Sequence, residues 1–334
     1  MLSLTQEENV SSVNNSRREL AALVAGCGIH CSNRTLFSII GRDRVRWLNG
    51  MVTNNVRDLA AGNGVYSFVL NPQGHILGDL YVFNLGESLV AEIGHEQSES
   101  LLQVLRRYII MDKVEITDLS AEKTAINVTG SKSADVLAAV GLKAELGSLQ
   151  FANLSWNGIE ITAMRGDNPC FPNYEVWIAA NQADTFLSAL QAAGATTVGN
   201  ETLETFRILC GIPRFGKDIR ERTLPQETGQ DRALNFNKGC YIGQEIVERI
   251  RARGSVHRTF VGFEIEGSAP GPGTKVQANG KDVGEITSVM SAPLKQKRLA
   301  LGYLRKEAME TGEALTAGEA IVKARPLPFT DIFD

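Results

Sequence analysis

Apolar positions recur with two different spacings along the chain. Runs rich in Phe, Ile and Val at 35–40 and 65–70 are typical of strands, whereas the segment 43–49 between them carries a helical period. Residues 99–110 have leucines spaced for one face of a further helix. Because helix, strand and turn keep alternating well beyond these segments, the pattern predicts a mixed α+β region.

A turn follows the strand-like run at 65–70. The sequence at 71–74, Asn-Pro-Gln-Gly, has proline second and glycine fourth, which is a common β-turn pattern. We therefore expect residues 65–70 and 76–83 to pair as a hairpin, with Asp79 near its mouth.

The chain changes character near Gly254. From there on, short strand-like runs are separated by Gly and Pro turns, which is the pattern of a small antiparallel barrel or sandwich. The runs are residues 258–265, 276–278, 283–287, 299–304 and 320–323. We place a boundary here, so that residues 1–253 form one region and residues 254–334 form a β-rich domain.

Composition and charge exclude several classes of protein. With 43% hydrophobic and 22% charged residues, the chain is neither disordered nor fibrous. The 34 Lys and Arg against 38 Asp and Glu give a net charge of −4, so nucleic acid and anionic membranes are not expected partners. No apolar stretch approaches the about 20 residues that span a bilayer, and residues 1–15 do not resemble a secretory signal. We expect a cytoplasmic protein.

The five cysteines suit reduced thiols better than a disulfide framework. Cys27 and Cys31 have three residues between them and only His30 as a nearby imidazole, so we expect no metal site and no stable iron–sulfur cluster within one chain. Cys27, Cys170 and Cys210 are expected to pack as small hydrophobic residues.

One segment concentrates the candidate chemistry. Residues 238–245 read Lys-Gly-Cys-Tyr-Ile-Gly-Gln-Glu and run into an amphipathic stretch that predicts a helix starting near Tyr241. Cys240 would then lie at a helix N-terminus, where free N–H groups and the Lys238 ammonium favour the thiolate. The alternative is a buried cysteine with a packing role.

This segment resembles the signature of the YgfZ group of folate-binding proteins, which are relatives of the glycine cleavage T-protein, the aminomethyltransferase. The resemblance extends over nearly the whole chain, and further matching stretches are 47–54, 70–74, 211–218 and 224–227. It implies an α+β fold of three domains in a cloverleaf ring that binds tetrahydrofolate or a one-carbon derivative, with a C-terminal antiparallel β-barrel. Residues 1–253 would then be a folate-binding region of two interleaved α+β subdomains.

The resemblance also implies roles for individual residues. Glu175 lines up with the pterin-binding glutamate of the T-protein; the alternative is a surface acid at a strand edge. Arg207 aligns with an arginine and would hold a folate carboxylate; the alternative is a salt-bridge partner. The remaining cofactor contacts expected are Tyr241, Gln244 and Asn71. The expected catalytic residues are Cys240, Lys238 and Asp79.

The chain departs from the T-protein pattern in places. It has Gly78-Asp79 where the T-protein has two adjacent aspartates, and the T-protein lacks the cysteine at position 240. Residues 166–171 replace a Gly-Tyr-Thr-Gly-Glu motif, which changes the lip of the expected pocket.

Basic residues cluster beside Cys240. A charged helix end that complements the helix dipole is one interpretation, and an anion site for a folate tail or for RNA is another. Few aromatic residues and the net acidic charge argue against RNA. The cluster consists of Lys238, Arg249, Arg251, Arg253 and Arg258.

These observations lead to a main hypothesis and two alternatives. The main hypothesis is a tetrahydrofolate-binding accessory protein that supports assembly or repair of iron–sulfur clusters in client enzymes, with assembly proteins as further partners and Cys240 as the functional thiol. One alternative is a folate-dependent aminomethyltransferase or demethylase-type one-carbon transferase that depends on Asp79. The other is a scaffold that binds no folate.

Overall fold

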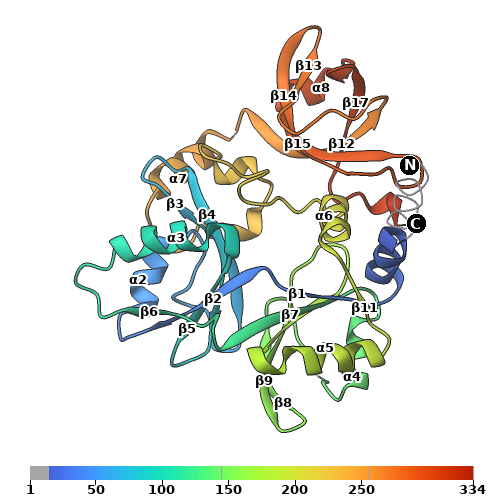
Figure 1. Cartoon of the computed structure of the whole chain (residues 1–334). Coiled ribbons are helices and arrows are strands. Elements are labelled where there is room, and N and C mark those ends of the chain that lie inside the picture. Colours follow the sequence, from blue (N-terminus) through green and yellow to red (C-terminus); the bar gives the residue numbers. More distant parts are fainter. Residues whose placement is uncertain (1–14, 144, 255, 334) are drawn as a thin grey trace, which may run out of the picture. The chain divides into compact units, whose positions relative to one another are not determined.

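The structure, a computed structural model, describes residues 15–143, 145–254 and 256–333 (Figure 1). The chain forms two compact units. The first takes in the described residues up to Ser32, then Ser120–Cys210 and Phe333, and the second takes in Asn33–Leu119 and Gly211–Ile332. Each unit contains both sheet and helices, which confirms the mixed α/β class. No helix in the described ranges is long and apolar enough to cross a membrane.

The first unit is built on a six-stranded sheet with the order β11-β1-β7-β10-β9-β8. Neighbouring strands are antiparallel except for β1 and β11, which are parallel. The strands are β1 (Gly28–Cys31), β7 (Lys123–Thr129), β8 (Phe151–Trp156), β9 (Ile159–Arg165), β10 (Asn173–Ala179) and β11 (Thr196–Thr197).

Two helices cover one face of this sheet, α4 (Ser133–Ala139) and α5 (Ala183–Ala192). Val176 on β10 alternates onto this face and packs in one core with Phe186 and Leu190 of α5. Each fully buried side chain of this size contributes about 1.5–3 kcal/mol to folding. This unit also contains α6 (Asn200–Leu209), which carries Arg207.

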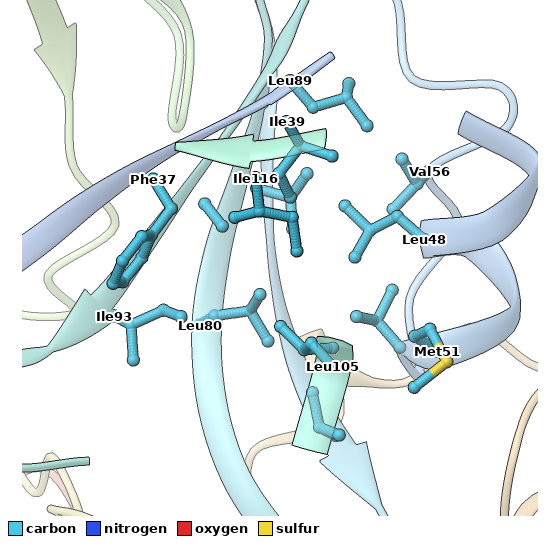
Figure 2. Packing of buried hydrophobic residues seen from close by; sticks show 14 of the residues in the cluster. Phe37, Ile39, Leu48, Met51, Val56, Leu80, Leu89, Ile93, Leu105 and Ile116 are labelled. Atoms are coloured by element: carbon cyan, nitrogen blue, oxygen red, sulfur yellow. The ribbon is translucent and has the colours of Figure 1, made fainter. Parts of the chain in front are cut away.

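The second unit contains a five-stranded sheet with the order β3-β4-β5-β2-β6. The strands are β2 (Arg34–Ile40), β3 (Gly64–Leu70), β4 (Ile76–Asn84), β5 (Leu89–Gly94) and β6 (Glu115–Asp118), and the helices are α2 (Arg44–Met51) and α3 (His95–Arg107). Strands β3 and β4 pair antiparallel, which confirms the predicted hairpin. Figure 2 shows Leu48 and Met51 of α2 gathered with Leu80 and Leu105 in the core.

The C-terminal strands close into a six-stranded antiparallel barrel with the order β12-β15-β14-β13-β16-β17. The elements are β12 (Arg258–Glu266), β13 (Lys275–Ala278), β14 (Lys281–Val289), β15 (Arg298–Arg305), α8 (Lys306–Glu310), β16 (Leu315–Ala317) and β17 (Ala320–Arg325). The expected barrel is therefore confirmed, with one additional short strand, β16.

The segment before the barrel packs on the β3–β4 hairpin. It contains short turns of 3-10 helix at Pro225–Glu227 and Asp231–Ala233 and the helix α7 (Gln244–Arg253). Tyr66 and Phe68 of β3 share a buried cluster with Tyr241 and with Val247 of α7. This packing fixes where residues 238–243 lie on the hairpin.

The predicted start of α7 near Tyr241 is wrong. The helix begins at Gln244, because Gly243 has a φ of 83° and interrupts the helical conformation. A Cβ at Gly243 would lie 2.6 Å from the carbonyl oxygen of Asn71, so this glycine also allows close contact with the hairpin turn. Cys240 is therefore not at a helix N-terminus, and the helix dipole does not account for a thiolate there.

Candidate functional site

Asp79 is a buried carboxylate held by donors on both oxygens. The Tyr66 hydroxyl donates to Asp79 Oδ2 at 2.7 Å, and Gln97 Nε2 of α3 donates to Oδ1 at 2.5 Å. The backbone N–H of Asp79 donates in turn to Gln97 Oε1 at 3.1 Å. We call Tyr66, Asp79 and Gln97 the Asp79 cluster. Its hydrogen bonds fix both the position and the orientation of the carboxylate.

The electrostatics of this cluster keep Tyr66 protonated. Burial and the neighbouring Asp79 carboxylate raise the pKa of Tyr66 well above its ordinary value, so its hydroxyl remains a hydrogen-bond donor. The Arg232 guanidinium lies 4.4 Å from the centre of the Tyr66 ring and covers one face of it.

Two side chains of α3 lie close to Gly78. A Cβ at Gly78 would lie 2.7 Å from Gln97 Oε1 and 2.8 Å from the Leu101 side chain. An aspartate at this position would therefore require the ends of the Gln97 and Leu101 side chains to move. Glycine at position 78 thus leaves Gln97 in place to hold the Asp79 carboxylate.

Lys238 anchors the segment that carries Cys240. Its ammonium donates to the carbonyl oxygens of Asn49, Val52 and Asn54 at 2.6, 2.5 and 2.7 Å. Burial and the Arg57 guanidinium lower the pKa of Lys238 to about 7, while the three carbonyl acceptors favour the charged form. An ammonium has three donors, and all three are used here. We call residues 238–243 the Cys240 loop.

Cys240 itself is exposed at the surface of this loop. A Cβ at Gly239 would lie 3.1 Å from Arg57 Nη2, so the Arg57 guanidinium packs against the backbone immediately before Cys240. The Arg57 guanidinium is therefore close to the backbone of Gly239, whereas the Lys238 ammonium donates all its hydrogen bonds to carbonyl oxygens. No local pattern predicts this contact, because Arg57 and Gly239 are far apart along the chain.

The other expected contacts in this unit have local partners. Tyr241 is buried in the hairpin cluster, and burial together with Glu248 raises its pKa to about 12. Asn71 Oδ1 accepts the N–H of His75 at 2.9 Å and so closes the hairpin turn. Gln244 is the first residue of α7. Whether these three residues touch a ligand stays a prediction.

Basic side chains of this cluster form ion pairs and ring contacts with neighbouring residues of the fold. Arg258 donates to both carboxylate oxygens of Glu227 at 3.0 Å. Arg251 Nη1 lies 3.5 Å from Glu248 Oε2, and the Arg251 guanidinium carbon lies 4.4 Å from the centre of the Phe236 ring. These contacts favour the interpretation of a charged helix end over that of an anion site.

Glu175 lies in the interior of the first unit's sheet. Its strand, β10, is flanked on both sides by β7 and β9, and the residue is 6% exposed. The Trp177 indole donates to Glu175 Oε1 at 2.7 Å. The alternative of a surface acid at a strand edge is therefore excluded.

Arg207, in the same unit, forms an ion pair on α6. Its Nε and Nη2 donate to the two carboxylate oxygens of Glu204, three residues earlier, at 2.9 and 2.7 Å. This geometry matches the salt-bridge alternative, and a contact of Arg207 with a folate carboxylate stays a prediction.

The remaining cysteines differ in exposure. Cys27 and Cys210 are buried, and burial raises the pKa of Cys27 to about 12. Cys170 is half-buried and hydrogen-bonded to Cys210, whereas Cys31 is exposed. In the part of the chain that the structure describes, no group of three or more His, Cys, Asp or Glu residues is arranged to hold a metal.

Comparison with known families decides the relationship of the chain. The model of the GCVT N-terminal domain matches residues 8–238, and that of the glycine cleavage T-protein C-terminal barrel domain matches residues 258–328. The chain belongs to the GCVT family. The two matches cover the mixed α/β part and the closed barrel in turn.

Individual members of the GCVT family support this relationship. An aminomethyltransferase of Rippkaea orientalis is 27% identical over 299 residues, which are 84% of this chain and 78% of that protein. A chloroplastic protein of Arabidopsis thaliana is 26% identical over 287 residues, and the match covers 85% of this chain but only 66% of that relative's length. A cytoplasmic location for this chain therefore stays a prediction.

A solved structure of the GCVT family has the same fold. The glycine cleavage system aminomethyltransferase T from Bartonella henselae superposes with a TM-score of 0.84 at 21% identity, covering 94% of this chain and 89% of that one. The expected GcvT-like fold is confirmed by this match. The narrower YgfZ-type assignment is not decided by any of these relatives.

Sequence reasoning missed several residues of these sites. Tyr66 lies diagonally across the hairpin from Asp79, so counting the register from the turn would have found it. Gln97 and Trp177 carry no such signal: Gln97 reaches Asp79 from a helix, and Trp177 is one of three tryptophans that pattern alone does not distinguish.

Proposed function

We propose that the chain binds tetrahydrofolate or a one-carbon derivative and transfers a one-carbon group, as an aminomethyltransferase or demethylase-type enzyme. Membership of the GCVT family supports this reaction class. The observation that carries the proposal is the buried Asp79 carboxylate, held on both oxygens by Tyr66 and Gln97. A carboxylate fixed in this way is suited to hold a proton or to stabilise a developing positive charge.

Glu175 fits the pterin ring of a folate. Glu175 is a buried carboxylate, and a pterin presents adjacent N–H groups that pair with a carboxylate. Trp177 on β10 and its direct partner Ala125 on β7 lie on the same face of the sheet as Glu175 and offer the apolar surface that a flat ring needs. The further folate contacts that we propose are Arg207, Tyr241, Gln244 and Asn71.

In this proposal the chain's own residues orient and move a proton. Tetrahydrofolate supplies the nitrogen atoms that carry the one-carbon unit. Asp79 holds or accepts the proton released there, and Tyr66 keeps donating to Asp79 because its raised pKa leaves it protonated. Gln97 fixes the second oxygen, so that the carboxylate does not rotate during the transfer.

Turnover with isotope-labelled substrates tests this function. Purified protein is incubated with tetrahydrofolate and a panel of amines that carry 13C-labelled methyl or aminomethyl groups, and labelled folate is followed by NMR. We expect product with the natural chain and a loss of about 100-fold or more with Asp79→Asn, since removal of a general base costs of this order. Asp135→Asn, at an exposed site, is the matched control. Absence of product across the panel would contradict the proposal.

The exposed Cys240 favours a second candidate function. A thiol presented beside Arg57, on a loop anchored by a buried lysine, is unlike a packing cysteine. We propose as this second candidate a YgfZ-type accessory role in which the chain binds folate and supports assembly or repair of iron–sulfur clusters, with client and assembly proteins as partners. In this role the accessible Cys240 sulfur would be the group that meets the folate-bound one-carbon unit or the client cluster.

Complementation separates the two candidates. Cells that lack the protein receive the natural chain, Cys240→Ala or Asp79→Asn, and the activity of iron–sulfur enzymes is measured in extracts. The accessory role predicts that Cys240→Ala fails, while Cys31→Ala, which removes the other exposed thiol, succeeds. Full activity with Cys240→Ala would exclude the thiol from the function. For both candidates we propose a folate-binding region of residues 1–253 followed by a barrel domain of residues 254–334. We also propose a cytoplasmic location for both.

A further inference from the structure

The sheet of the first unit has two unlike faces, and both are largely buried. One face is the apolar core under α4 and α5, to which Ile29 of β1 and Val176 of β10 belong. Side chains alternate between the faces of a strand, so the residues next to these point the other way. His30 and Glu175 therefore lie together on the second face, which is rich in polar groups.

Strand pairing sets these polar residues in one row. His30 on β1 is the direct partner of Asn127 on β7, and Asn127 is the direct partner of Glu175 on β10. The row continues to Met164 on β9. Adjacent strands are about 4.8 Å apart, so His30 and Glu175 stand about 10 Å apart, with Asn127 between them.

His30 has an unused polar atom in this row. Its Nδ1 is buried and has no hydrogen-bond partner among the described residues. A buried polar atom without a partner costs about 1–3 kcal/mol, which a bound ligand would offset. Burial also lowers the pKa of His30 to about 4, so the imidazole is neutral at pH 7 and each ring nitrogen either donates or accepts.

We propose that His30 is a further ligand-binding residue, whose Nδ1 hydrogen-bonds one edge of the pterin ring while Glu175 pairs with the opposite edge above Asn127. This inference rests on the proposed binding of tetrahydrofolate. The bicyclic ring has donors and acceptors on both edges and so matches two polar groups separated by one strand. His30 thereby recognises the ring, not the aminobenzoyl-glutamate tail.

Two substitutions at His30 separate hydrogen bonding from shape. Asn places a polar atom near the position of Nδ1, whereas Leu fills the space without one. We expect His30→Leu to weaken tetrahydrofolate binding about tenfold, the loss typical of one buried hydrogen bond, and His30→Asn to retain most of the affinity. Cys31→Ser, on the next residue of β1, is the matched control. Thermal unfolding verifies that each variant is folded.

The choice of ligand locates the contact. A reduced pterin that lacks the tail, 6-methyltetrahydropterin, should lose affinity for His30→Leu by the same factor as tetrahydrofolate, and p-aminobenzoylglutamate should bind all variants alike. In protein labelled with 15N-histidine, tetrahydrofolate should shift the Nδ1 resonance that His30→Asn removes.

The outcomes distinguish this inference from the proposed function. If the natural chain binds tetrahydrofolate and His30→Leu binds it within twofold, the assignment of His30 is wrong while folate binding stands. If the Nδ1 resonance is unchanged by saturating ligand, a buried water is the partner of His30 and the inference is again wrong. If the natural chain binds no reduced folate, both proposals are wrong.

Discussion

The Asp79 cluster and the Cys240 loop belong to the same unit and share one buried aromatic cluster, yet they are built in opposite ways. Asp79 is a buried charge on a central hairpin strand, held on both oxygens by Tyr66 and Gln97. Cys240 is exposed. The buried charge in its loop is the Lys238 ammonium, which donates hydrogen bonds to backbone carbonyl oxygens. The hairpin thus presents an immobilised carboxylate suited to proton transfer, while the loop presents an accessible thiol suited to a larger partner.

Removal of the Lys238 anchor should have the largest effect on stability. Lys238→Met leaves the carbonyl oxygens of Asn49, Val52 and Asn54 without their charged donor, and we expect the free energy of unfolding to fall by about 3 kcal/mol. Urea denaturation measures this, with the exposed Lys281→Met as control. An unchanged midpoint would mean that the loop is not anchored in this way.

Removal of the Tyr66 hydroxyl should lower the rate of one-carbon transfer more than it lowers the stability of the fold. Tyr66→Phe keeps the ring in its cluster but deletes the hydrogen bond to Asp79, so we expect about tenfold slower transfer with a stability loss of about 1 kcal/mol. Tyr303→Phe, at a buried tyrosine of the barrel strand β15, is the comparison and should transfer at the natural rate. Equal rates for the two variants would mean that the Tyr66 hydroxyl does not act on the Asp79 carboxylate.

Alkaline pH should expose the buried tyrosine of the loop. Burial and Glu248 raise the pKa of Tyr241 to about 12, whereas a tyrosine in an unfolded chain ionises near 10. The neutral form therefore stabilises the fold below pH 10, and we expect about 1–2 kcal/mol to be lost between pH 10 and 12. Tyr241→Phe should show a correspondingly shallower decline in urea titrations at these pH values. A decline in stability as steep as that of the natural chain would mean that the raised pKa of Tyr241 is not its cause.

Changing the exposed thiol should have the smallest effect on stability. Because Cys240 packs against little, Cys240→Ser should change the free energy of unfolding by less than about 0.5 kcal/mol. In native protein a maleimide should label Cys240 and Cys31 rapidly and the buried Cys27 and Cys210 slowly, as read by peptide mass spectrometry. Slow labelling of Cys240 would place it with the packing cysteines.

The sequence predicts those features whose signals are local. The proline and glycine of the turn at 71–74 predict the β3–β4 hairpin, and the short runs after Gly254 predict the barrel. The start of α7 is mispredicted because Ile242 continues the apolar period of the helix, while the φ of Gly243 breaks it. Periodicity reports which face is apolar and is insensitive to one left-handed residue.

The candidate sites depend on contacts that no local pattern encodes. Lys238 lies two residues from Cys240, which predicts a cation beside the thiol, but its ammonium turns instead to carbonyls some 180 residues earlier. Arg57 approaches from that same distant segment. Residue types thus indicate which chemistry is present, and only the fold decides which charge meets which group.

Titration of tetrahydrofolate into the full chain by calorimetry tests the central claim most directly. We predict saturable binding at one site, with an affinity at least about tenfold lower for Glu175→Gln, because the ring loses its charged acceptor, and an unchanged affinity for Cys240→Ala. Absence of binding by the natural chain, or equal affinity of Glu175→Gln, would contradict the account.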